Sequence, residues 1–501
     1  MIKPHTAFPA LACLAAGALT TLAFAPFGAW WLAPLTLAVL FVLTTGIPAR
    51  RAAFFGGLFG LGFFALGVNW VSISIHIYGH SPLAMAWGAA AALIVYLAAF
   101  PALMMYLANR LAGQASLTRF LLVLPGLWLL SEWLRSWLFT GFPWLSLGYS
   151  QIDSPLSGYA PLLGYFGAAG ALLLSAGVLA AVILRPRRYW PALLVAGLLW
   201  LIGFSLQGRE WTTPAGEALS VSLIQGNIPQ EQKWLPEEQL ATMEHYLSMT
   251  RQEWYGDPDW KPDLVVWPET AIPAFYHQVE DGFIAQLQRE TAAAGSALLT
   301  GIPVLDRGDW QYYNAVVSIG PAPRFYYKRH LVPFGEYLPL RRWLDDLLAV
   351  MPLPVADFSS GSDEQPLLTA AGYAVGTTIC YEIIFPEDVR STLPQAAFLV
   401  NVSNDGWFGD SWAPHQHLEM ARMRALEAGR YLLRATNTGI SAVITPQGRV
   451  STVAPPFAAA VVRDRIVPLQ GATPYVHWGD WPMLGLALLA VLIGLVRRKK
   501  P

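Results

Sequence analysis

Charged residues and cysteine are both scarce in this sequence. Only 13% of the 501 residues are charged and 54% are hydrophobic, whereas a soluble domain carries about 25% charged residues. The two cysteines, Cys13 and Cys380, lie far apart, and neither belongs to a zinc-type spacing. The composition therefore indicates a membrane protein, and we expect no disulfide framework and one thiol that is free to react.

Long apolar runs account for much of this composition. A membrane-spanning helix needs about 20 residues, or about 17 at the short end. Eight runs are close to this length or longer, at residues 8–25, 28–45, 52–70, 82–108, 118–139, 161–184, 190–206 and 481–496. The first run resembles a signal peptide, but more spans follow before the polar region, so we expect it to be retained.

The fifth run contains two charged residues, Glu132 and Arg135, three positions apart on one helix face. Charges inside a membrane are often functional. We favour the interpretation that these two form a structural ion pair near the outer end of the helix.

Basic residues lie in every second connection between the apolar runs. Three connections, at 26–27, 71–81 and 140–160, contain no Lys or Arg. The basic positions are Lys3, Arg50, Arg51, Arg110, Arg119, Arg185, Arg187, Arg188 and the RRKK tail at 497–500. The positive-inside rule places both termini in the cytoplasm. We therefore predict a seven-helix membrane domain at 1–206, an outer domain at 207–479, and an eighth helix with a cytoplasmic tail at 480–501.

The outer region is acidic and has an α/β pattern. It holds 19 Lys and Arg against 30 Asp and Glu, so nucleic acid is not an expected partner. Short β-rich runs occur at 219–228, 263–270, 296–304, 313–320, 373–382, 397–405 and 441–448, and helical patterns at 236–255, 280–294 and 415–436. Such alternation predicts sheets covered by helices. The apolar stretch 337–354 has no clean period and is interpreted as a lid or a membrane-dipping loop.

Three expected strands end on reactive residues. These residues are Glu269 in LVVWPET, Lys328 followed by Glu336 in FYYKRHLVPFGEY, and Cys380 in GTTICYE. The carboxyl ends of strands in open α/β folds gather at one rim, where sites form. Because a free thiol has a pKa of about 8.5, Cys380 needs a base to act as a nucleophile at neutral pH.

Two kinds of base are compatible with the sequence. One is a histidine oriented by an amide, for which the candidates are His330, His415 and His417 with Asn401 or Asn404. The other is a carboxylate whose pKa is raised by burial, for which Glu269 is suited, with Lys328 holding the oxyanion. Spacing alone does not choose between a Cys–His and a Cys–Glu–Lys site.

The order of Glu269 in WPET, Lys328 in YYKRHLVPFGE and Cys380 in CYE resembles the Glu–Lys–Cys triad of the nitrilase superfamily. The resemblance continues through NVSNDGWFG (401–409) and MARMRALEAGRYLLRATNTGISAVITPQG (420–448) and covers roughly 220–465. With seven spans before this region and one after it, the whole chain resembles the apolipoprotein N-acyltransferase family.

The resemblance implies an αββα sandwich joined to an α-helical membrane bundle in the bacterial inner membrane, with the sandwich in the periplasm. It implies that Cys380 takes an acyl chain from a phospholipid as a thioester and passes it to the N-terminal amine of a diacylglyceryl apolipoprotein. Glu269 would be the base. Lys328 and the backbone N–H of Tyr381 would hold the oxyanion. Glu336 and Glu382 match supporting carboxylates.

Some assignments and competing functions remain open at this level. Trp234 and Trp407 are candidates to line the acyl entrance, although packing or interface anchoring is the commoner role of tryptophan. No cofactor is expected, and His415 and His417 lack a third ligand for zinc. Two other functions fit parts of the pattern. A membrane-tethered amidase or hydrolase would share the triad, and a transporter or lipid-binding protein would carry an inactive domain.

Overall fold

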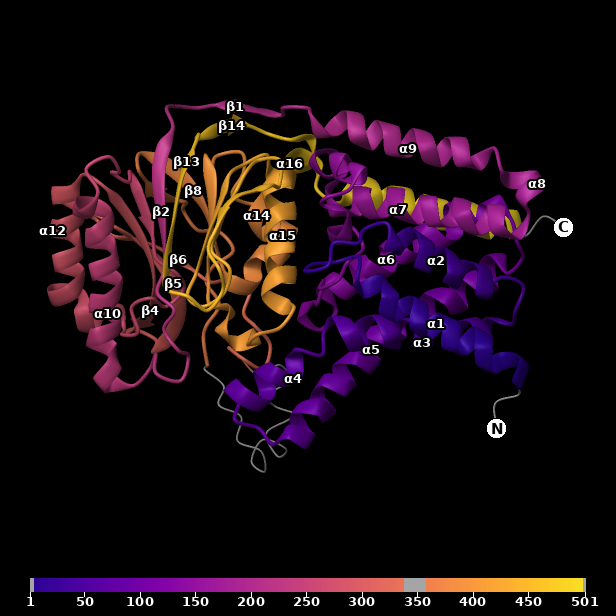
Figure 1. Cartoon of the computed structure of the whole chain (residues 1–501), viewed down its shortest axis with the longest axis horizontal. Helices are drawn as coiled ribbons and strands as arrows, with labels where there is room; N and C mark the ends of the chain where they lie inside the picture. Colours follow the sequence, from indigo (N-terminus) through magenta and orange to yellow (C-terminus); the bar gives the residue numbers. More distant parts are fainter. Residues whose placement is uncertain (1–3, 338–356, 499–501) are drawn as a thin grey trace.

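The computed structural model describes residues 4–337 and 357–498. They form a helical bundle (residues 4–207 and 481–498) and, beside it, a sandwich of two sheets (residues 212–478) (Figure 1). Almost all of the stretch 337–354, interpreted above as a lid or membrane-dipping loop, lies outside the described residues.

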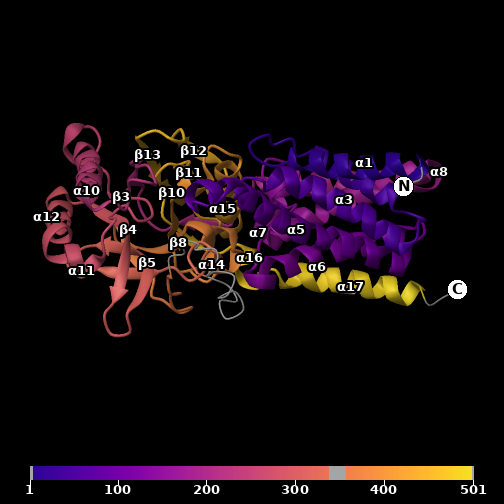
Figure 2. The ribbon, with the colours of Figure 1, turned by 90° about the horizontal axis from the view of Figure 1, so that it is seen from below.

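The bundle consists of apolar helices that run alongside one another. They are α1 (Pro4–Thr21), α2 (Leu32–Leu43), α3 (Ala49–Gly67), α5 (Leu83–Ala112), η2 (Arg119–Val123) continued by α6 (Leu124–Trp137), α7 (Ala160–Leu184), α9 (Ala192–Gln207) and α17 (Trp481–Arg498). Figure 2 shows α17 packed along α6, so the last helix closes the bundle against the middle of the chain.

The described helices agree only in part with the expected spans. Each of the eight apolar runs overlaps one helix of the bundle. Three helical stretches, Ala49–Gly67, Leu83–Ala112 and Pro155–Leu184, are long and apolar enough to cross a membrane, and others are shorter. The number of eight spans therefore stays a prediction.

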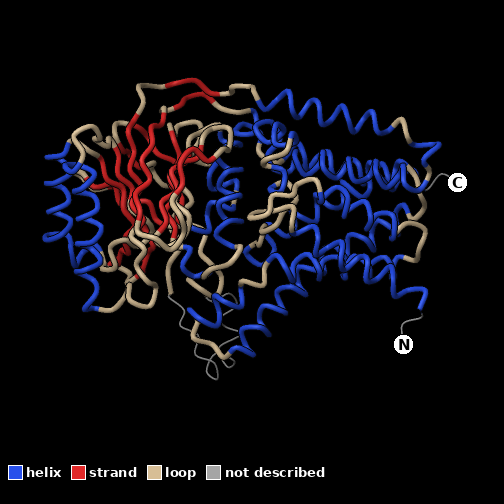
Figure 3. Tube along the Cα trace, viewed as in Figure 1, coloured by secondary structure: helices blue, strands red, loops and turns tan. Residues whose placement is uncertain are grey.

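Short elements link the bundle to the sandwich on one side. They are α4 (Val71–Ile73), η1 (Ser74–Tyr78), η3 (Leu138–Thr140), η4 (Tyr149–Gln151) and η5 (Pro155–Tyr159). Another short helix, α8 (Pro186–Tyr189), joins α7 to α9 at the opposite end of the bundle. Figure 3 shows loops concentrated where the two parts meet.

Two six-stranded sheets form the centre of the sandwich within the described residues. One has the order β13-β2-β3-β4-β5-β6 and the other β12-β11-β10-β9-β8-β7. The first contains β13 (Ala460–Ile466), β2 (Leu219–Gln225), β3 (Leu264–Val266), β4 (Ala297–Asp306), β5 (Gln311–Ile319) and β6 (Arg324–Tyr327). The second contains β12 (Val450–Val453), β11 (Ala442–Ile444), β10 (Leu432–Thr436), β9 (Phe398–Ser403), β8 (Tyr373–Ile379) and β7 (Leu368–Ala370). A separate pair, β1 (Thr212–Pro214) with β14 (Leu469–Gly471), joins the sandwich to α9 and to α16 (Pro474–Trp478).

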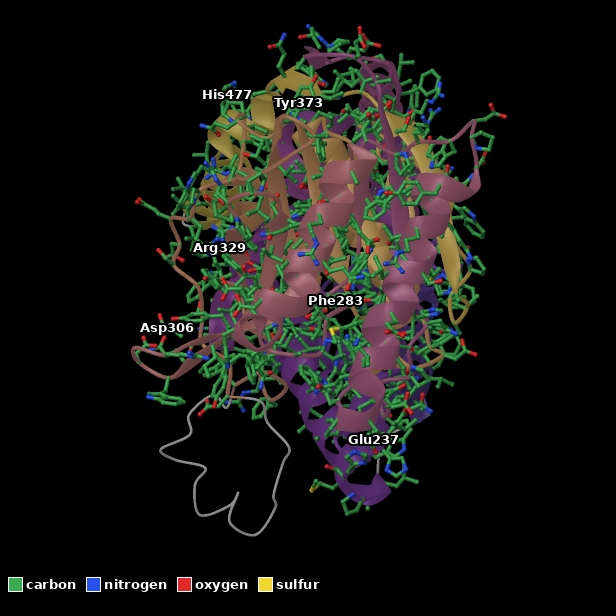
Figure 4. All side chains as sticks on the ribbon, turned by 90° about the vertical axis from the view of Figure 1, so that its left-hand side faces the viewer. Glu237, Phe283, Asp306, Arg329, Tyr373 and His477 are labelled. Atoms are coloured by element: carbon green, nitrogen blue, oxygen red, sulfur yellow. The ribbon has the colours of Figure 1, made fainter. Side chains whose placement is uncertain are left out.

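The alternation of side chains along the strands creates two apolar layers. In β3, Leu264 and Val266 face the second sheet, while Val265 faces the helices on the outside. The outer helices on this side are α10 (Pro236–Arg251), continued by η6 (Gln252–Gly256), and α11 (Tyr276–Val279), η7 (Glu280–Ile284) and α12 (Ala285–Ala294). Figure 4 shows α10, marked by Glu237, and η7, marked by Phe283, in front of the sheets.

The opposite face of the sandwich packs against the bundle. It carries α14 (Pro386–Arg390) and α15 (Ala413–Ala428), with η8 (Cys380–Ile384) and η9 (Asp405–Phe408) nearby. Apolar side chains of α15, such as Met420 and Met423, share one core with residues of the bundle. The order of layers is therefore helix, sheet, sheet, helix, as expected for an αββα sandwich.

One expected helix is too long. The pattern at 415–436 predicted a single helix, but α15 ends at Ala428 and Leu432–Thr436 forms strand β10 in the middle of a sheet. Gly429 ends the helix with a left-handed φ of 61°, a conformation that glycine adopts without steric cost. The residues of β10 are all buried, and periodicity alone does not distinguish such a short buried strand from a helix.

Candidate active site

Glu269 lies at the carboxyl end of β3, after Trp267 and Pro268. Its carboxylate is almost buried, and Oε1 accepts a hydrogen bond of 2.7 Å from Nδ2 of Asn314 in β5. The neighbouring strand approaches this turn so closely that a Cβ on Gly301 would lie 2.4 Å from the backbone nitrogen of Thr270. Glycine at 301 therefore allows the main chain to hold Glu269 against β4 and β5.

Lys328 follows β6 and is 1% exposed. Its Nζ lies 2.8 Å from Glu336 and 3.8 Å from Oε1 of Glu269. Burial is the largest influence and lowers the pKa of Lys328, but the carboxylates of Glu336 and Glu269 outweigh it, so the pKa is raised. The amine therefore remains an ammonium throughout the neutral pH range.

Cys380 begins the turn after β8 with a left-handed φ of 50°. A non-glycine residue rarely adopts this conformation, and it is found mainly where the surrounding structure imposes it. Burial, followed by the charge of Glu269, raises the pKa of the thiol to about 12, and Lys328 opposes the rise. Cys380 is thus a neutral thiol at rest, under the influence of both charged groups.

Glu382 connects the backbone beside Cys380 with the backbone beside Lys328. One oxygen, Oε2, accepts from the Ile379 amide at 2.7 Å and from the Tyr326 hydroxyl at 3.0 Å. The other, Oε1, accepts from the backbone amides of Arg329 and His330. This side chain is fully buried, and burial raises its pKa. The resemblance had marked it as a supporting carboxylate, and its contacts show how it links two strand ends.

None of the three candidate histidines bonds to the Cys380 thiol. His417 directs Nε2 at the backbone oxygen of Cys380, at 3.2 Å, and His330 directs Nε2 at the backbone oxygen of Thr140, at 3.0 Å. Burial lowers the pKa of His330 to about 4 and also lowers that of His415. The geometry therefore favours the carboxylate base of the two alternatives that the sequence left open.

A network of buried polar side chains contacts the backbone of Cys380. Burial, and then the charge of Arg434, lower the pKa of His417, while Asp405 opposes the change. The Nε2 atom of His417 donates to the Cys380 carbonyl oxygen at 3.2 Å, and Nδ1 lies 3.0 Å from Oδ1 of Asp405. Arg434 also bonds Asp405. Burial raises the pKa of this carboxyl, but the Arg434 guanidinium and the contacts of His417 and Ser403 outweigh burial, so the pKa lies well below its usual range. Asn401 donates weakly to the same carbonyl of Cys380, at 3.4 Å. Asp405 is therefore part of this network.

Sequence reasoning missed two residues that contact Glu269. One is Asn314, described above. The other is Lys233, which is 2% exposed and donates from Nζ to the backbone oxygen of Glu269 at 3.0 Å. Burial lowers the pKa of Lys233 to about 8, against the charges of Glu269 and Cys380. The only signal in the sequence was a lysine beside Trp234, in a loop without periodicity.

The two candidate tryptophans lie at the surface. Trp234 is 45% exposed, and Trp407 is 43% exposed and makes an edge contact with Tyr78 of η1 at 5.7 Å between ring centroids. The backbone oxygen of Trp407 also accepts from the hydroxyl of Ser74. Their exposure is compatible with contact to a substrate. Among the described residues, no group of three or more His, Cys, Asp or Glu is placed to hold a metal ion.

The expected ion pair between Glu132 and Arg135 is wrong. In the described structure their charged ends bond to the following loop rather than to each other. Glu132 Oε1 accepts from the Leu147 amide at 2.8 Å, and Arg135 Nη1 donates to the backbone oxygens of Phe142 and Trp144, each at 2.6 Å. Their helix ends at Trp137, so the chain turns back and offers its free backbone groups to both side chains.

Comparisons with known proteins agree with this architecture. A family model described as the apolipoprotein N-acyltransferase N-terminal domain matches residues 16–178, and one described as carbon-nitrogen hydrolase matches residues 220–468. An apolipoprotein N-acyltransferase from Methylococcus capsulatus is 47% identical over 98% of this chain and 96% of its own length. The chain belongs to the apolipoprotein N-acyltransferase family.

Other members and structures extend the comparison. Apolipoprotein N-acyltransferases from Azotobacter vinelandii and Vibrio cholerae are 43% and 41% identical, over 98% and 97% of this chain and 95% and 97% of theirs. Solved structures similar to part of the chain include a CN-hydrolase superfamily protein from Xanthomonas campestris, with 19% identity, a TM-score of 0.37, and coverage of 54% of this chain and 97% of that one. A carbon-nitrogen hydrolase from Helicobacter pylori has 14% identity, a TM-score of 0.38, and coverage of 56% and 95%. As a member of the apolipoprotein N-acyltransferase family with a carbon-nitrogen hydrolase domain, the chain is an acyltransferase.

Proposed function

We propose that this enzyme moves an acyl chain from a phospholipid to the α-amine of an N-terminal diacylglyceryl-cysteine on an apolipoprotein, through a thioester on Cys380. Membership of the apolipoprotein N-acyltransferase family supports the acceptor. The observation that carries the mechanism is the convergence of Glu269, Lys328 and Cys380 from three strand ends, with both charges acting on the thiol.

In the first half-reaction, the Cys380 sulfur attacks the ester carbonyl of the phospholipid. Because the thiol pKa is about 12, the proton must leave as attack occurs, and Glu269 accepts it. The ammonium of Lys328, together with the backbone N–H of Tyr381, stabilises the oxyanion. The carbon–oxygen bond of the ester then breaks, and Glu269 returns the proton to the departing oxygen of the lysophospholipid.

In the second half-reaction, the amine of the acceptor attacks the thioester. Glu269 takes a proton from the attacking nitrogen and gives it to the departing sulfur, so the thiol is restored and an amide is formed. The same oxyanion donors serve both steps. A covalent intermediate thus divides one difficult transfer into two easier ones.

The supporting residues keep these groups in place. Asn314 orients the carboxylate of Glu269, and Lys233 holds its backbone. Glu336 pairs with Lys328 and fixes its amine beside Glu269. Trp234 and Trp407, both half exposed, are assigned to the surface that the lipid tails approach.

Both substrates carry lipid tails, which accounts for the helical bundle. The exposed face of α9 is almost wholly apolar, and within that helix only Gly203 is buried. Such a surface suits lipid rather than water. We assign residues 1–206 and 480–501 to the membrane parts, with seven helices and one, and residues 207–479 to the periplasmic side of the bacterial inner membrane, as the basic loops predict.

Two competing functions make different products. A hydrolase with the same triad would release free fatty acid, and a lipid-binding protein would turn nothing over. The test uses the full chain in lipid nanodiscs with a labelled phospholipid and a diacylated lipopeptide, with Cys13→Ala as the control and Cys380→Ala as the inactive variant. We expect labelled amide from the wild type and from Cys13→Ala only. Free fatty acid as the main product would establish the hydrolase instead.

A further inference from the structure

The loop that follows α6, residues 138–147, has an unusual backbone. Phe139, Thr140 and Gly141 are consecutive and have φ values of 52°, 76° and 85°. A Cβ on Gly141 would lie 2.0 Å from the backbone oxygen of Ser136. Non-glycine residues adopt these left-handed φ values only where the surrounding structure imposes them, so contacts from elsewhere must hold the 138–147 loop in place.

The bundle holds one side of this loop. Arg135 is 3% exposed and donates to the backbone oxygens of Phe142 and Trp144 and, at 3.1 Å, to the hydroxyl of Ser146. Glu132, 5% exposed, accepts from the amide of Leu147. The hydrogen bonds of these two charged side chains within an apolar helix thus go to the loop and to Trp128, their neighbour in the same helix.

The sandwich holds the other side. The hydroxyl of Tyr381 donates to the backbone oxygen of Gly141 at 3.1 Å, and His330 bonds the oxygen of Thr140. The indole nitrogen of Trp144 donates to Oε1 of Gln416 at 2.6 Å. The Trp144 ring also packs against the imidazole of His417, with 5.7 Å between ring centroids.

Three of these partners in the sandwich, Tyr381, His330 and His417, adjoin Cys380 or contact a residue that does. Tyr381 follows Cys380 in the chain and supplies a proposed oxyanion donor. The amide of His330 bonds Glu382, which also holds the backbone before Cys380. His417 donates to the carbonyl of Cys380 itself. The loop therefore touches the supports of the nucleophile at three points.

We infer that the 138–147 loop sets the position of the Cys380 thiol, and that Arg135 and Glu132 are positioning residues that act through it. This inference rests on the proposed function, in which Cys380 is the nucleophile. The bundle then does more than retain the enzyme in a membrane, since its buried charges hold a loop that contacts the residues around Cys380.

The test uses two substitutions that reach the loop from opposite sides, in full-length enzyme carrying Cys13→Ala and held in lipid nanodiscs. Arg135→Lys keeps the charge but loses the planar fork that binds two carbonyls. Trp144→Phe keeps a ring against His417 but loses the N–H to Gln416. Arg51→Lys is the control, because Arg51 lies over a ring of its own helix in the same bundle and does not contact the loop.

Two rates are measured: acylation of Cys380 by phospholipid, and its alkylation by iodoacetamide without lipid substrate. We expect both loop variants to lower kcat for acylation by about tenfold or more, as a misplaced group would, with KM within about twofold of the wild type. Alkylation of Cys380 should also slow, and the double variant should lose less than the product of the two single effects. Arg51→Lys should match the wild type.

Unchanged alkylation and kcat in a folded Trp144→Phe enzyme would overturn the inference, even if Arg135→Lys fails to fold. A loss confined to KM or to thermal stability would show a structural role only. A different result would show that the proposed function is wrong. If Cys380 is not the nucleophile, the wild-type enzyme would still transfer acyl chains after its Cys380 has been alkylated.

Discussion

Replacing Glu269 by Gln separates two ways in which Cys380 can be activated. The substitution keeps the size of the side chain, and its Oε1 can still accept from Asn314. It removes a negative charge that raises the pKa of the thiol. In Glu269→Gln the thiol pKa must therefore fall below the value of about 12 in the wild type, and more thiolate is present at any given pH.

The rate of acylation distinguishes the two ways of activating Cys380, because one predicts a faster rate in Glu269→Gln and the other a slower rate. If the enzyme used a thiolate formed beforehand, each unit of fall in pKa would raise the rate up to about tenfold. If Glu269 is the base, the rate falls, and a positioned base contributes about 10²- to 10⁴-fold. We expect a loss of that size, together with faster alkylation of the thiol.

Single-turnover acylation from a fluorescent phospholipid, in a Cys13→Ala background, measures the first rate, and alkylation as a function of pH measures the thiol pKa. Glu244→Gln, on the exposed side of α10, serves as the control for loss of one carboxylate. Acylation by Glu269→Gln at or above the wild-type rate would refute the assignment of the base.

Further predictions concern Lys328, Lys233 and the membrane topology. Lys328→Arg should lose at least about 10²-fold in both half-reactions, measured separately, because a planar guanidinium does not replace a compact ammonium at the oxyanion, and near-normal rates would contradict this role. Lys233→Met should slow acylation by about tenfold. Because burial lowers the pKa of Lys233 from 10.5 to about 8, the folded state holds fewer protons between these values and the wild type gains stability as pH rises through them. Lys233→Met should lose this gain in Tm between pH 7 and 9.5, unlike the exposed Lys261→Met, and an equal gain in both variants would contradict it. A reporter fused after residue 206 should be active only in the periplasm and one fused after residue 501 only in the cytoplasm, and the reverse would contradict the topology.

The candidate site residues that follow strands could be predicted from the sequence. The residues that reach the site through tertiary contacts could not. Glu269, Lys328 and Cys380 each follow a short apolar run, and the structure places them at the ends of β3, β6 and β8. Lys233 reaches Glu269 from a loop whose path depends on the packing of α10. No local sequence pattern predicts the contact between Lys233 and Glu269.

The same distinction explains the expectations that were wrong. Glu132 and Arg135 share a helix face, which correctly predicted their proximity, but their bonding depends on where the chain turns after Trp137. The strand at Leu432–Thr436 was predicted as helix because five residues that are all buried show no alternation of buried and exposed positions. Its neighbours in the sheet, β9 and β11, determine its conformation.

The acyl-enzyme itself is the central claim, and mass spectrometry of the protein tests it directly. Wild type and Cys13→Ala would be incubated with phospholipid in the absence of any acceptor, and the peptide covering residues 376–390 would be analysed after digestion. We predict one acyl chain on Cys380, removed by hydroxylamine at neutral pH and by subsequent addition of a diacylated lipopeptide, and no adduct on Cys13. If amide product forms at the normal rate while no acyl adduct on Cys380 can be detected with the acceptor withheld, the transfer is direct and the two-step account is contradicted.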